Sequence, residues 1–262
     1  MNGVPPRADG SRQCQSNYAG QPFARRGMYD HEKRSLKARK ILAVLEDWGG
    51  DPSRLELLDV SCSTGIMTRV FAGHFGRVTG IDIDVEAVDF ANRHQNGLEI
   101  RYHVMDALNT SFDSGSFDVI ICNQMYEHVA DARRLMTEIH RLLKPGGVCY
   151  FGATNRLKLV EPHYGNIPFL SIMPKPLASL LLRLLRRADD YYETHLTLWG
   201  LRQLVGHFEV IDYTRRVIED PVRFHATDLF RPESFRQRAA LAVLSRAYWL
   251  FPGYIWLLKK TS

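Results

Sequence analysis

Residues 58–65 read LDVSCSTG, and they decide the fold expected for this chain. The apolar residues Leu55–Ser61 predict a short buried strand, and the small residues after it predict a tight turn into a helix from about Thr64. A cofactor can approach the backbone closely only where side chains are small, and the amides at a helix N-terminus favour an anionic group. The segment therefore predicts a nucleotide-cofactor site at the end of the first strand.

Strand and helix patterns alternate on both sides of this segment. The predicted helices are 32–48, Val85–Arg93 and Ala132–Leu143, from apolar residues at helical spacing. The further strands are predicted at Arg77–Asp82, Glu99–Asp106, Phe117–Asn123 and Val148–Ala153, the last after a turn at 144–147. Such alternation implies βαβ crossovers and a parallel sheet.

The pattern changes after Asn155. We expect two mostly helical insertions that cap the sheet, at about 156–193 and 219–250. The remaining elements are predicted as a helix at 197–206, a sixth strand at Phe208–Thr214 and a seventh at Tyr254–Lys260. With residues 1–30 as a mobile leader or a lid over the cofactor, residues 31–262 form one predicted domain.

Polar residues end four successive predicted strands. Asp59 lies near the end of the first, and Asp82, Asp106 and Asn123 are the last residues of the second, third and fourth. An acid after the second strand can accept hydrogen bonds from both ribose hydroxyls, and Asp106 can accept one from an adenine amino group. Each residue alone is explained equally well as a turn former. Together they indicate a ligand site, because ligands of open α/β sheets bind at the carboxyl ends of the strands.

Several motifs resemble those of the class I S-adenosylmethionine-dependent methyltransferases. The spacing Asp59-x-Ser61-x-Ser63-x-Gly65 looks like their first motif, D-x-G-x-G-x-G, and residues 80–84 (GIDID) resemble the second. Residues 105–107 (MDA) match the pair that contacts adenine, 117–129 (FDVIICNQMYEHV) the fourth-strand motif, and 143–147 (LKPGG) the turn before strand five. The resemblance covers about 30–155 and is nearest to the branch of quinone and other small-molecule methyltransferases.

The resemblance implies an α/β fold and a cofactor. The fold is a Rossmann-like, seven-stranded, mostly parallel sheet with an antiparallel last strand, helices on both faces and helical cap insertions. The cofactor is S-adenosyl-L-methionine, from which a methyl group passes in line to an acceptor, most readily at oxygen. The implied cofactor-binding residues are Asp59, Ser61, Cys62, Ser63, Gly65, Asp82, Ile83, Asp106, Ala107 and Asn123.

Two serines depart from the glycine pattern of the first motif. Ser61 and Ser63 carry a Cβ, which resists positive φ by about 1–2 kcal/mol, so the loop either uses ordinary angles or tolerates strain. Their hydroxyls can bind the carboxylate of the cofactor. The departure leaves a second hypothesis open, a catalytically weak or inactive cofactor-binding scaffold. A nicotinamide enzyme is disfavoured because G-x-G-x-x-G is absent.

The acceptor side has weaker signals. His128 follows the fourth strand and His163 lies in the first insertion, and each is a candidate general base because imidazole titrates near neutrality. A packing or capping role explains either histidine as well. Insertions cover the acceptor in the family, so the predicted lining residues are Tyr126, Tyr164, Tyr191, Tyr192 and His195.

One predicted helix suggests the nature of the acceptor. Residues 177–187 place five leucines on one face and three arginines opposite. Such a helix packs on its own domain or lies on an anionic membrane surface. We therefore expect a small-molecule or lipid-linked acceptor, with peripheral membrane contact as the second interpretation. The apolar stretch 239–258 is interrupted by Arg246 and by a Pro-Gly pair, which favours a helix followed by a strand over a membrane span.

Composition sets the remaining expectations. The chain is 45% hydrophobic and 24% charged, as in globular proteins, and its net charge is +5. The four cysteines form no CxxC pair and no His/Cys cluster, so we expect no disulfide, no metal site and a cytoplasmic location. No secretory signal is visible. Nucleic acid is not an expected partner, because residues 123–126 (NQMY) do not form an Asn-Pro-Pro-Tyr motif for flipped bases. The oligomeric state is not predicted.

Overall fold

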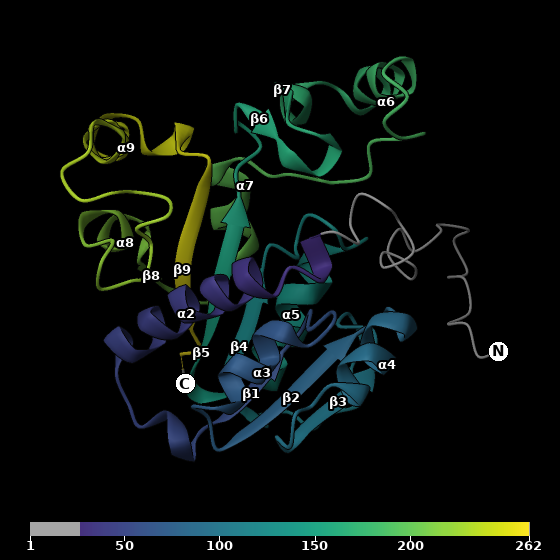
Figure 1. Cartoon of the computed structure of the whole chain (residues 1–262), viewed down its shortest axis with the longest axis vertical. Helices are drawn as coiled ribbons and strands as arrows, with labels where there is room; N and C mark the ends of the chain where they lie inside the picture. Colours follow the sequence, from purple (N-terminus) through teal and green to yellow (C-terminus); the bar gives the residue numbers. More distant parts are fainter. Residues whose placement is uncertain (1–26, 262) are drawn as a thin grey trace.

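A seven-stranded sheet forms the centre of the molecule (Figure 1). The computed structural model describes residues 27–261, so most of the predicted leader 1–30 lies outside the described residues. The sheet order is β3-β2-β1-β4-β5-β9-β8. The strands are β1 (Glu56–Asp59), β2 (Arg77–Asp82), β3 (Ile100–Val104), β4 (Phe117–Asn123), β5 (Leu143–Thr154), β8 (Glu209–Asp212) and β9 (Gly253–Lys259).

The sheet is parallel apart from one strand. Strand β9 pairs antiparallel with both β5 and β8, while β1 to β5 pair parallel with their neighbours. This is the predicted fold class: a Rossmann-like sheet with an antiparallel last strand. The order reverses between β1 and β4, and ligands of such sheets bind outside the carboxyl ends of the strands at that point.

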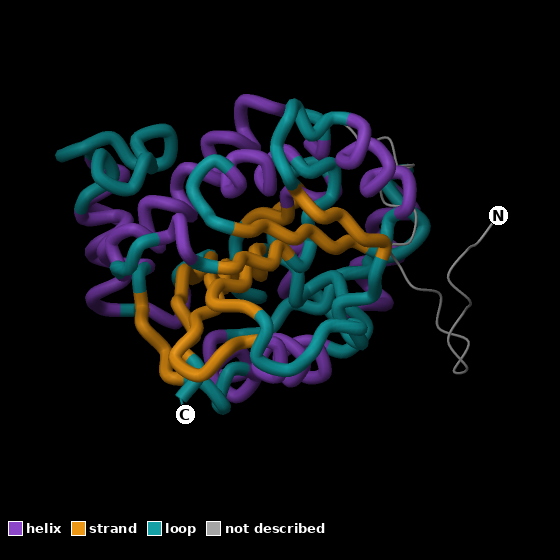
Figure 2. The backbone as a smooth tube through the Cα atoms, turned by 90° about the horizontal axis from the view of Figure 1, so that it is seen from below, coloured by secondary structure: helices purple, strands orange, loops and turns teal. Residues whose placement is uncertain are grey.

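Helices cover both faces of the sheet, as predicted (Figure 2). One face packs α2 (His31–Trp48), α3 (Ile66–Ala72), α4 (Val85–Arg93) and α8 (Thr214–Glu219), and the other packs α5 (Ala132–Leu142) and α7 (Leu198–Leu204). Successive strand residues alternate between the two cores: Leu57 belongs to the first and Leu58 to the second. Burial on both faces explains why the strands are nearly continuous apolar runs.

The first insertion contains more than the predicted helix. It forms a small antiparallel pair, β6 (Val160–Glu161) with β7 (Ile167–Pro168), two 3-10 turns, η2 (Pro162–Tyr164) and η3 (Leu170–Ile172), and then α6 (Lys175–Leu184). Figure 1 shows these elements beyond the carboxyl end of β5. The insertion therefore lies over the edge of the sheet at which a ligand is expected.

Helix α6 does not bury the face that its sequence suggests. Its buried residues are Ala178, Ser179 and Leu182, whereas Leu180 is 51% and Leu184 72% exposed. The expectation that the leucine face packs on its own domain is wrong. An exposed apolar face next to arginines is left on the surface.

Three predicted boundaries need correction. Strand β8 ends at Asp212, whose carboxylate accepts the amide of Thr214 at 2.8 Å and turns the chain into α8 instead of continuing the strand. The second insertion is helical mainly in α9 (Phe235–Arg246) and η4 (Tyr248–Leu250), and 220–234 is mostly turns. The predicted turn 144–147 lies within β5, at an irregularity in its pairing with β4.

Among residues 27–261, no helix is both long enough and apolar enough to cross a bilayer. The stretch 239–258 divides into the end of α9, η4 and strand β9, the helix and strand that were predicted.

Candidate active site

The loop after β1 is built on the buried carboxylate of Asp59. Its Oδ2 accepts the hydroxyl of Thr68 at 2.7 Å, and its Oδ1 accepts the amide of Ser61 at 3.4 Å. Burial raises the pKa of Asp59 to about 6, although these two donors act in the opposite direction. Asp59 thus joins the loop to the first turns of α3.

The two serines of the loop behave differently. Ser63 has a φ of 51°, whereas Ser61 is not among the residues with positive φ. The amide of Ser63 donates to Asp82 Oδ2 at 2.9 Å, which fixes the strained angle. The buried Oγ of Ser63 has no hydrogen-bond partner among the described residues, although it belongs to a residue that lines a cleft. A buried hydroxyl of this kind is suited to a ligand.

Close packing requires glycine at the start of α3. Gly65 has a φ of 71°, and a Cβ there would lie 2.5 Å from the hydroxyl of Tyr102. A Cβ at Gly80 would lie 2.8 Å from the Cβ of Cys62, so Cys62 packs against β2. These contacts let the loop lie directly against the end of β2.

The ends of β2 and β3 lie side by side. The amide of Met105 donates to the carbonyl of Asp82 at 2.9 Å. Asp82 Oδ1 accepts the amide of Asp84 at 3.0 Å, and Asp106 Oδ1 accepts the amide of Leu108 at 2.9 Å. Burial raises the pKa of Asp82, and the backbone donors Asp84 and Ser63 oppose that effect. Asp59, Asp82 and Asp106 thus follow three neighbouring strands at one edge of the sheet.

One cleft of about 460 Å³ is lined both by predicted cofactor-binding residues and by the two candidate bases. Of the predicted site residues it is lined by Asp59, Ser61, Ser63, Asp82, Asn123, His128 and His163. Cys62, Gly65, Ile83, Asp106 and Ala107 are not among its lining residues, so their contact with a cofactor stays a prediction.

Helix α2 contributes basic residues that the sequence analysis did not single out. Lys33, Arg34 and Lys37 line the same cleft. The Lys37 ammonium donates to the side chain of Gln124, and burial, followed by the charge of Arg34, lowers the pKa of Lys37 to about 8. The spacing of four residues between Lys33 and Lys37, which places them on one helix face, is the only signal in the sequence.

The two candidate bases also line the cleft. The rings of His128 and His163 are 5.0 Å apart, edge to face. Burial, followed by the positive charge of His163, lowers the pKa of His128 to about 3. His163 differs, because its Nδ1 is 2.6 Å from Glu161 Oε1. The two histidines are therefore not equivalent as proton acceptors.

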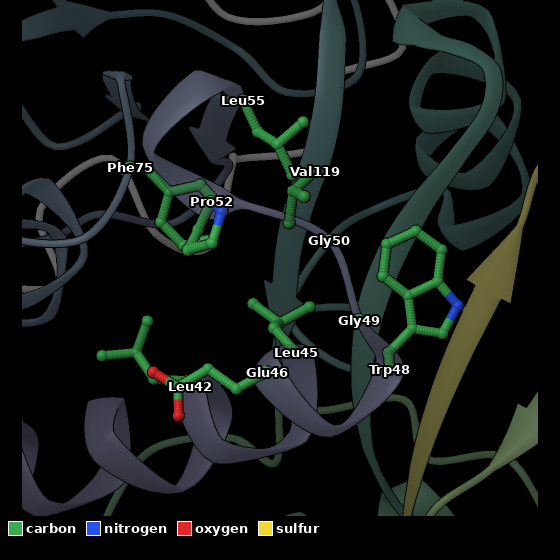
Figure 3. A pocket seen from close by; sticks show the side chains of 10 residues that line it. All are labelled: Leu42, Leu45, Glu46, Trp48, Gly49, Gly50, Pro52, Leu55, Phe75 and Val119. Atoms are coloured by element: carbon green, nitrogen blue, oxygen red, sulfur yellow. The ribbon is translucent and has the colours of Figure 1, made fainter.

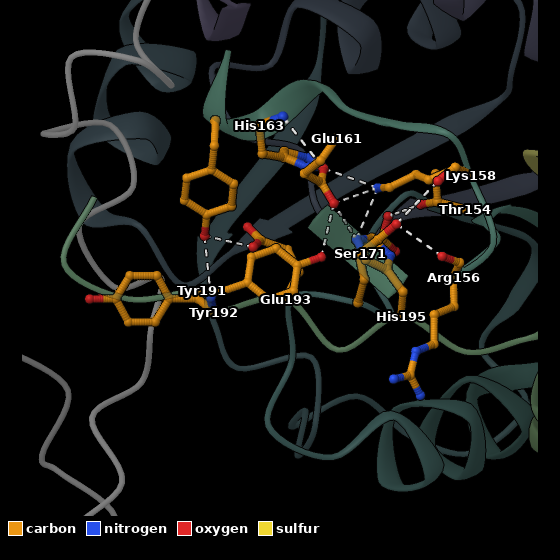
Figure 4. Close-up of polar contacts among 12 residues, drawn as sticks. Thr154, Arg156, Lys158, Glu161, His163, Ser171, Tyr191, Tyr192, Glu193 and His195 are labelled. Atoms are coloured by element: carbon orange, nitrogen blue, oxygen red, sulfur yellow. Dashed lines mark hydrogen bonds and ion pairs between the residues drawn. The ribbon is translucent and has the colours of Figure 1, made fainter. Parts of the chain in front are cut away.

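Glu161 is the centre of a buried network (Figure 4). Its members His163, Tyr191 and His195 were predicted as site residues, whereas Lys158 and the central position of Glu161 were not. The carboxylate of Glu161 also accepts from Lys158 Nζ at 2.9 Å and from the hydroxyl of Tyr191 at 2.9 Å, and it is 3.0 Å from His195 Nε2. Burial alone would raise the pKa of Glu161, but hydrogen bonds from His163 and His195 and the charge of Lys158 hold it well below its usual range. These donors therefore favour the carboxylate form of Glu161.

The predicted acceptor-lining residues lie around this network. Tyr164 donates to Glu193 at 2.6 Å, Tyr126 donates to the carbonyl of Thr154, and Tyr192 is 46% exposed. None of these tyrosines, nor Tyr191 or His195, is among the lining residues of the cleft. Their direct contact with an acceptor stays a prediction.

Glu161, His163 and His195 place one donor atom each within 4.8 Å of one another, a spacing that metal sites also show. Lys158 Nζ lies among these atoms, 2.9 Å from both Glu161 Oε2 and His195 Nε2. The ammonium therefore supplies the positive charge that a metal ion would bring. The expectation of no metal stays a prediction.

A second pocket lies near the other end of α2 (Figure 3). It is lined mainly by apolar side chains, among them Leu42, Leu45, Trp48 and Phe75. It holds about 20 Å³, and Glu46 is its only charged residue. This pocket is a gap in the core packing without the polar groups of the cleft.

The sheet order, the loop after β1 and the acid after β2 agree with the resemblance to the class I S-adenosylmethionine-dependent methyltransferases. Residues 58–151 match the family model described as a methyltransferase domain. The resemblance noted in the sequence is confirmed.

Curated relatives match a little over a third of the chain. A ubiquinone biosynthesis O-methyltransferase of Coxiella burnetii is 36% identical over 102 residues, which cover 38% of this chain and 44% of the relative. The chain thus spans less than half the length of that relative.

Solved structures match over more of the chain. An S-adenosylmethionine-dependent methyltransferase from Mesorhizobium loti has a TM-score of 0.56 at 16% identity and covers 83% of this chain and 96% of its own. A geranyl diphosphate C-methyltransferase from Streptomyces coelicolor was solved with S-adenosyl-L-homocysteine and has a TM-score of 0.52 at 18% identity. The match covers 95% of this chain and 87% of that chain. These likenesses show the fold.

Proposed function

We propose that this protein transfers a methyl group from S-adenosyl-L-methionine to a hydroxyl of a small or lipid-linked acceptor. One observation carries the proposal: a single cleft is lined by Asp82 and Ser63 at the cofactor end and by His163 at the other. Asn123, the last residue of β4, lines the same cleft. Methyl transfer needs a donor and an acceptor aligned in one cleft, and this arrangement provides both positions.

The residues of the cofactor end fit the proposed cofactor. Asp82 accepts from two backbone amides and keeps carboxylate oxygens at the cleft, where they can accept from ribose hydroxyls. Ser63 Oγ has no partner among the described residues and is placed to bind the amino-acid part. The cofactor supplies a sulfonium-bound methyl group and leaves as a neutral thioether.

The chain itself contributes alignment and proton transfer. Holding two reactants in line lowers a barrier by about 7–11 kcal/mol. A hydroxyl acceptor must also lose its proton, which requires a base near neutral pKa. His163 is the better candidate, because burial lowers the pKa of His128 to about 3 and makes it a weak base. As the acceptor oxygen bonds to the methyl carbon, its proton moves to His163 and then to water.

Oxygen is the proposed atom because the curated relative is a ubiquinone biosynthesis O-methyltransferase. The alternative is a cofactor-binding scaffold without turnover. The observation that favours it is the strained φ of Ser63, where the family motif has glycine. The two differ in turnover, since both bind the cofactor.

The test combines calorimetry with a labelled methyl group. We expect S-adenosyl-L-methionine to bind the wild type and to bind Asp82→Ala at least tenfold more weakly. Incubation of a cell extract with methyl-labelled cofactor should then label one acceptor, and His163→Gln should abolish labelling while cofactor binding persists. Binding without any labelled product would support the scaffold, and no binding would refute both.

The acceptor class follows from the exposed face of α6. Leu177, Leu180 and Leu184 are exposed on the insertion that lies beyond the cleft, and exposed arginines follow at Arg186 and Arg187. Apolar side chains next to basic ones suit an anionic lipid surface. We therefore include peripheral membrane contact and a lipid-linked acceptor in the proposal.

Vesicle sedimentation tests this contact. The protein should pellet with phosphatidylglycerol vesicles at low salt, and a double variant, Leu180→Ser with Leu184→Ser, should pellet several-fold less. The matched control is Phe235→Ser, since Phe235 is 79% exposed on another helix. Equal sedimentation of all three proteins would refute membrane contact through α6.

A further inference from the structure

Behind His163 the cap holds three ionisable side chains away from solvent. The side chains of Lys158, Glu161 and His195 are 4%, 0% and 1% exposed. Removing charged groups from water costs several kcal/mol each unless they are paired. A buried cluster of this size next to a cleft therefore calls for a functional explanation as well as a structural one.

Glu161 divides its two oxygens between different partners. Oε1 lies 2.6 Å from Nδ1 of His163, and it also accepts from Lys158 Nζ at 3.0 Å. Oε2 accepts from Lys158 and from the Tyr191 hydroxyl at 2.9 Å each, and it lies 3.0 Å from His195 Nε2. Because Glu161 is a carboxylate, the Nδ1 of His163 must be the protonated nitrogen of the neutral ring. Nε2 is then the nitrogen with a lone pair.

We propose that Lys158, Glu161 and His163 form a charge-compensated base, in which Glu161 fixes the tautomer of His163 and Lys158 balances the carboxylate. This inference rests on the proposed methyl transfer and names the groups that set its pH dependence. His163 is the catalytic residue, and Glu161 and Lys158 are positioning residues that act through it. The acceptor proton passes to His163 Nε2, the imidazolium keeps Nδ1–H on Glu161, and water later takes the proton.

Compensation has a defined purpose. A lone carboxylate beside a histidine stabilises the imidazolium, which cannot accept a proton. The ammonium 2.9 Å from Glu161 offsets that effect. The other groups facing His163 are His128, at 5.0 Å between rings, and Glu193, which is 3.7 Å from His128. His195 touches the same carboxylate from the far side.

Two substitutions should move the titration of His163 in opposite directions. Lys158→Met removes the balancing charge, so the midpoint of His163 should rise by about one pH unit. Glu161→Gln removes the carboxylate but keeps an acceptor for Nδ1–H, so the midpoint should fall by about one pH unit. The acid limb of the kcat profile should move in the same directions, because the neutral ring is the active form.

The measurement is NMR titration of ¹³C-labelled histidine, with His163 assigned from the signal missing in His163→Gln. Lys175→Met is the matched control: it removes a lysine charge from the same insertion, where Lys175 bonds Thr194 and Tyr192 instead of Glu161. It should leave the midpoint unchanged. Shifts in the same direction, or none, would overturn the proposal, and if Lys158→Met fails to fold, the shift in Glu161→Gln decides.

The titration needs neither cofactor nor acceptor. Opposite shifts in a protein that labels no acceptor would support the charge-compensated base and refute methyl transfer. Labelled product without opposite shifts would support methyl transfer and refute the charge-compensated base.

Discussion

At the scale of single residues, two residues that line the cleft adopt a left-handed backbone conformation although they are not glycine. Ser63 has a φ of 51° and Gln124 a φ of 53°. Ser63 is held by the bond from its amide to Asp82, and Gln124 by the bond from its amide to the carbonyl of Gly152 at 2.7 Å. Strain of this kind clusters at functional sites because the surrounding contacts over-determine it.

The strain at Ser63 predicts the response to glycine. Ser63→Gly removes a cost of about 1–2 kcal/mol in the folded state and adds about 0.5–1 kcal/mol of backbone entropy to the unfolded state. The free energy of unfolding should stay equal or rise by up to about 1.5 kcal/mol. Ser61→Gly, at an ordinary angle, should lower it by about 0.5–1 kcal/mol. Urea unfolding measures both, and a loss at Ser63 larger than at Ser61 would contradict the strain.

Asp59 predicts a pH dependence of stability. Burial raises its pKa to about 6 from an ordinary 3.8, so the folded state binds the proton more tightly than the unfolded state. Its contribution to stability is therefore full below pH 3.8 and is lost as the pH rises through about 6. Between pH 7 and 5 the wild type should gain about 1 kcal/mol relative to Asp59→Asn, which does not titrate. Urea unfolding at the two pH values checks this, and parallel curves for the two proteins would contradict it.

At the scale of elements, the orientation of α6 decides which of its leucines supports the fold. Leu182 is fully buried with Tyr164, Leu170 and Ala178, whereas Leu180 is 51% exposed. Leu182→Ala should lower the free energy of unfolding by about 2–4 kcal/mol, because it leaves a cavity. Leu180→Ala should change it by less than about 0.5 kcal/mol. Equal losses at both positions would show that the helix is turned differently.

The same helix shows what sequence periodicity does not predict. The run Phe117–Asn123 predicted β4 to the residue, because a strand buried on both faces leaves a continuous apolar signal. The leucines of α6 give an equally clear helical pattern, but periodicity does not tell whether an apolar face meets a core or a surface. Strands β6 and β7 have two residues each, too few for any period.

At the scale of the whole molecule, the sequence was sufficient for the sheet and for the prediction that Asp59, Ser63 and Asp82 lie close together. Asp59, Ser63 and Asp82 follow strands, and strand order in a doubly wound sheet brings such ends together. The contacts of Glu161 were missed because Lys158 and His195 are 37 residues apart, and neither lies in a segment with a strand or helix pattern. Polar partners that meet through an irregular insertion leave no periodic trace, so only the structure could join them.

Cofactor binding should stabilise the entire domain, because the cleft joins the loop after β1, α2 and the first insertion. A ligand at 100 times its Kd adds about 2.7 kcal/mol to the free energy of unfolding. For a chain of this size that corresponds to a rise in Tm of about 5–10 °C with S-adenosyl-L-homocysteine. Asp82→Ala should lose most of this rise, and Asp89→Ala, at an exposed acid on α4, should keep it. Thermal unfolding followed by circular dichroism measures the three shifts. An equal rise in Tm in both variants would mean that the ligand binds away from the end of β2. That result would refute the proposed cofactor site.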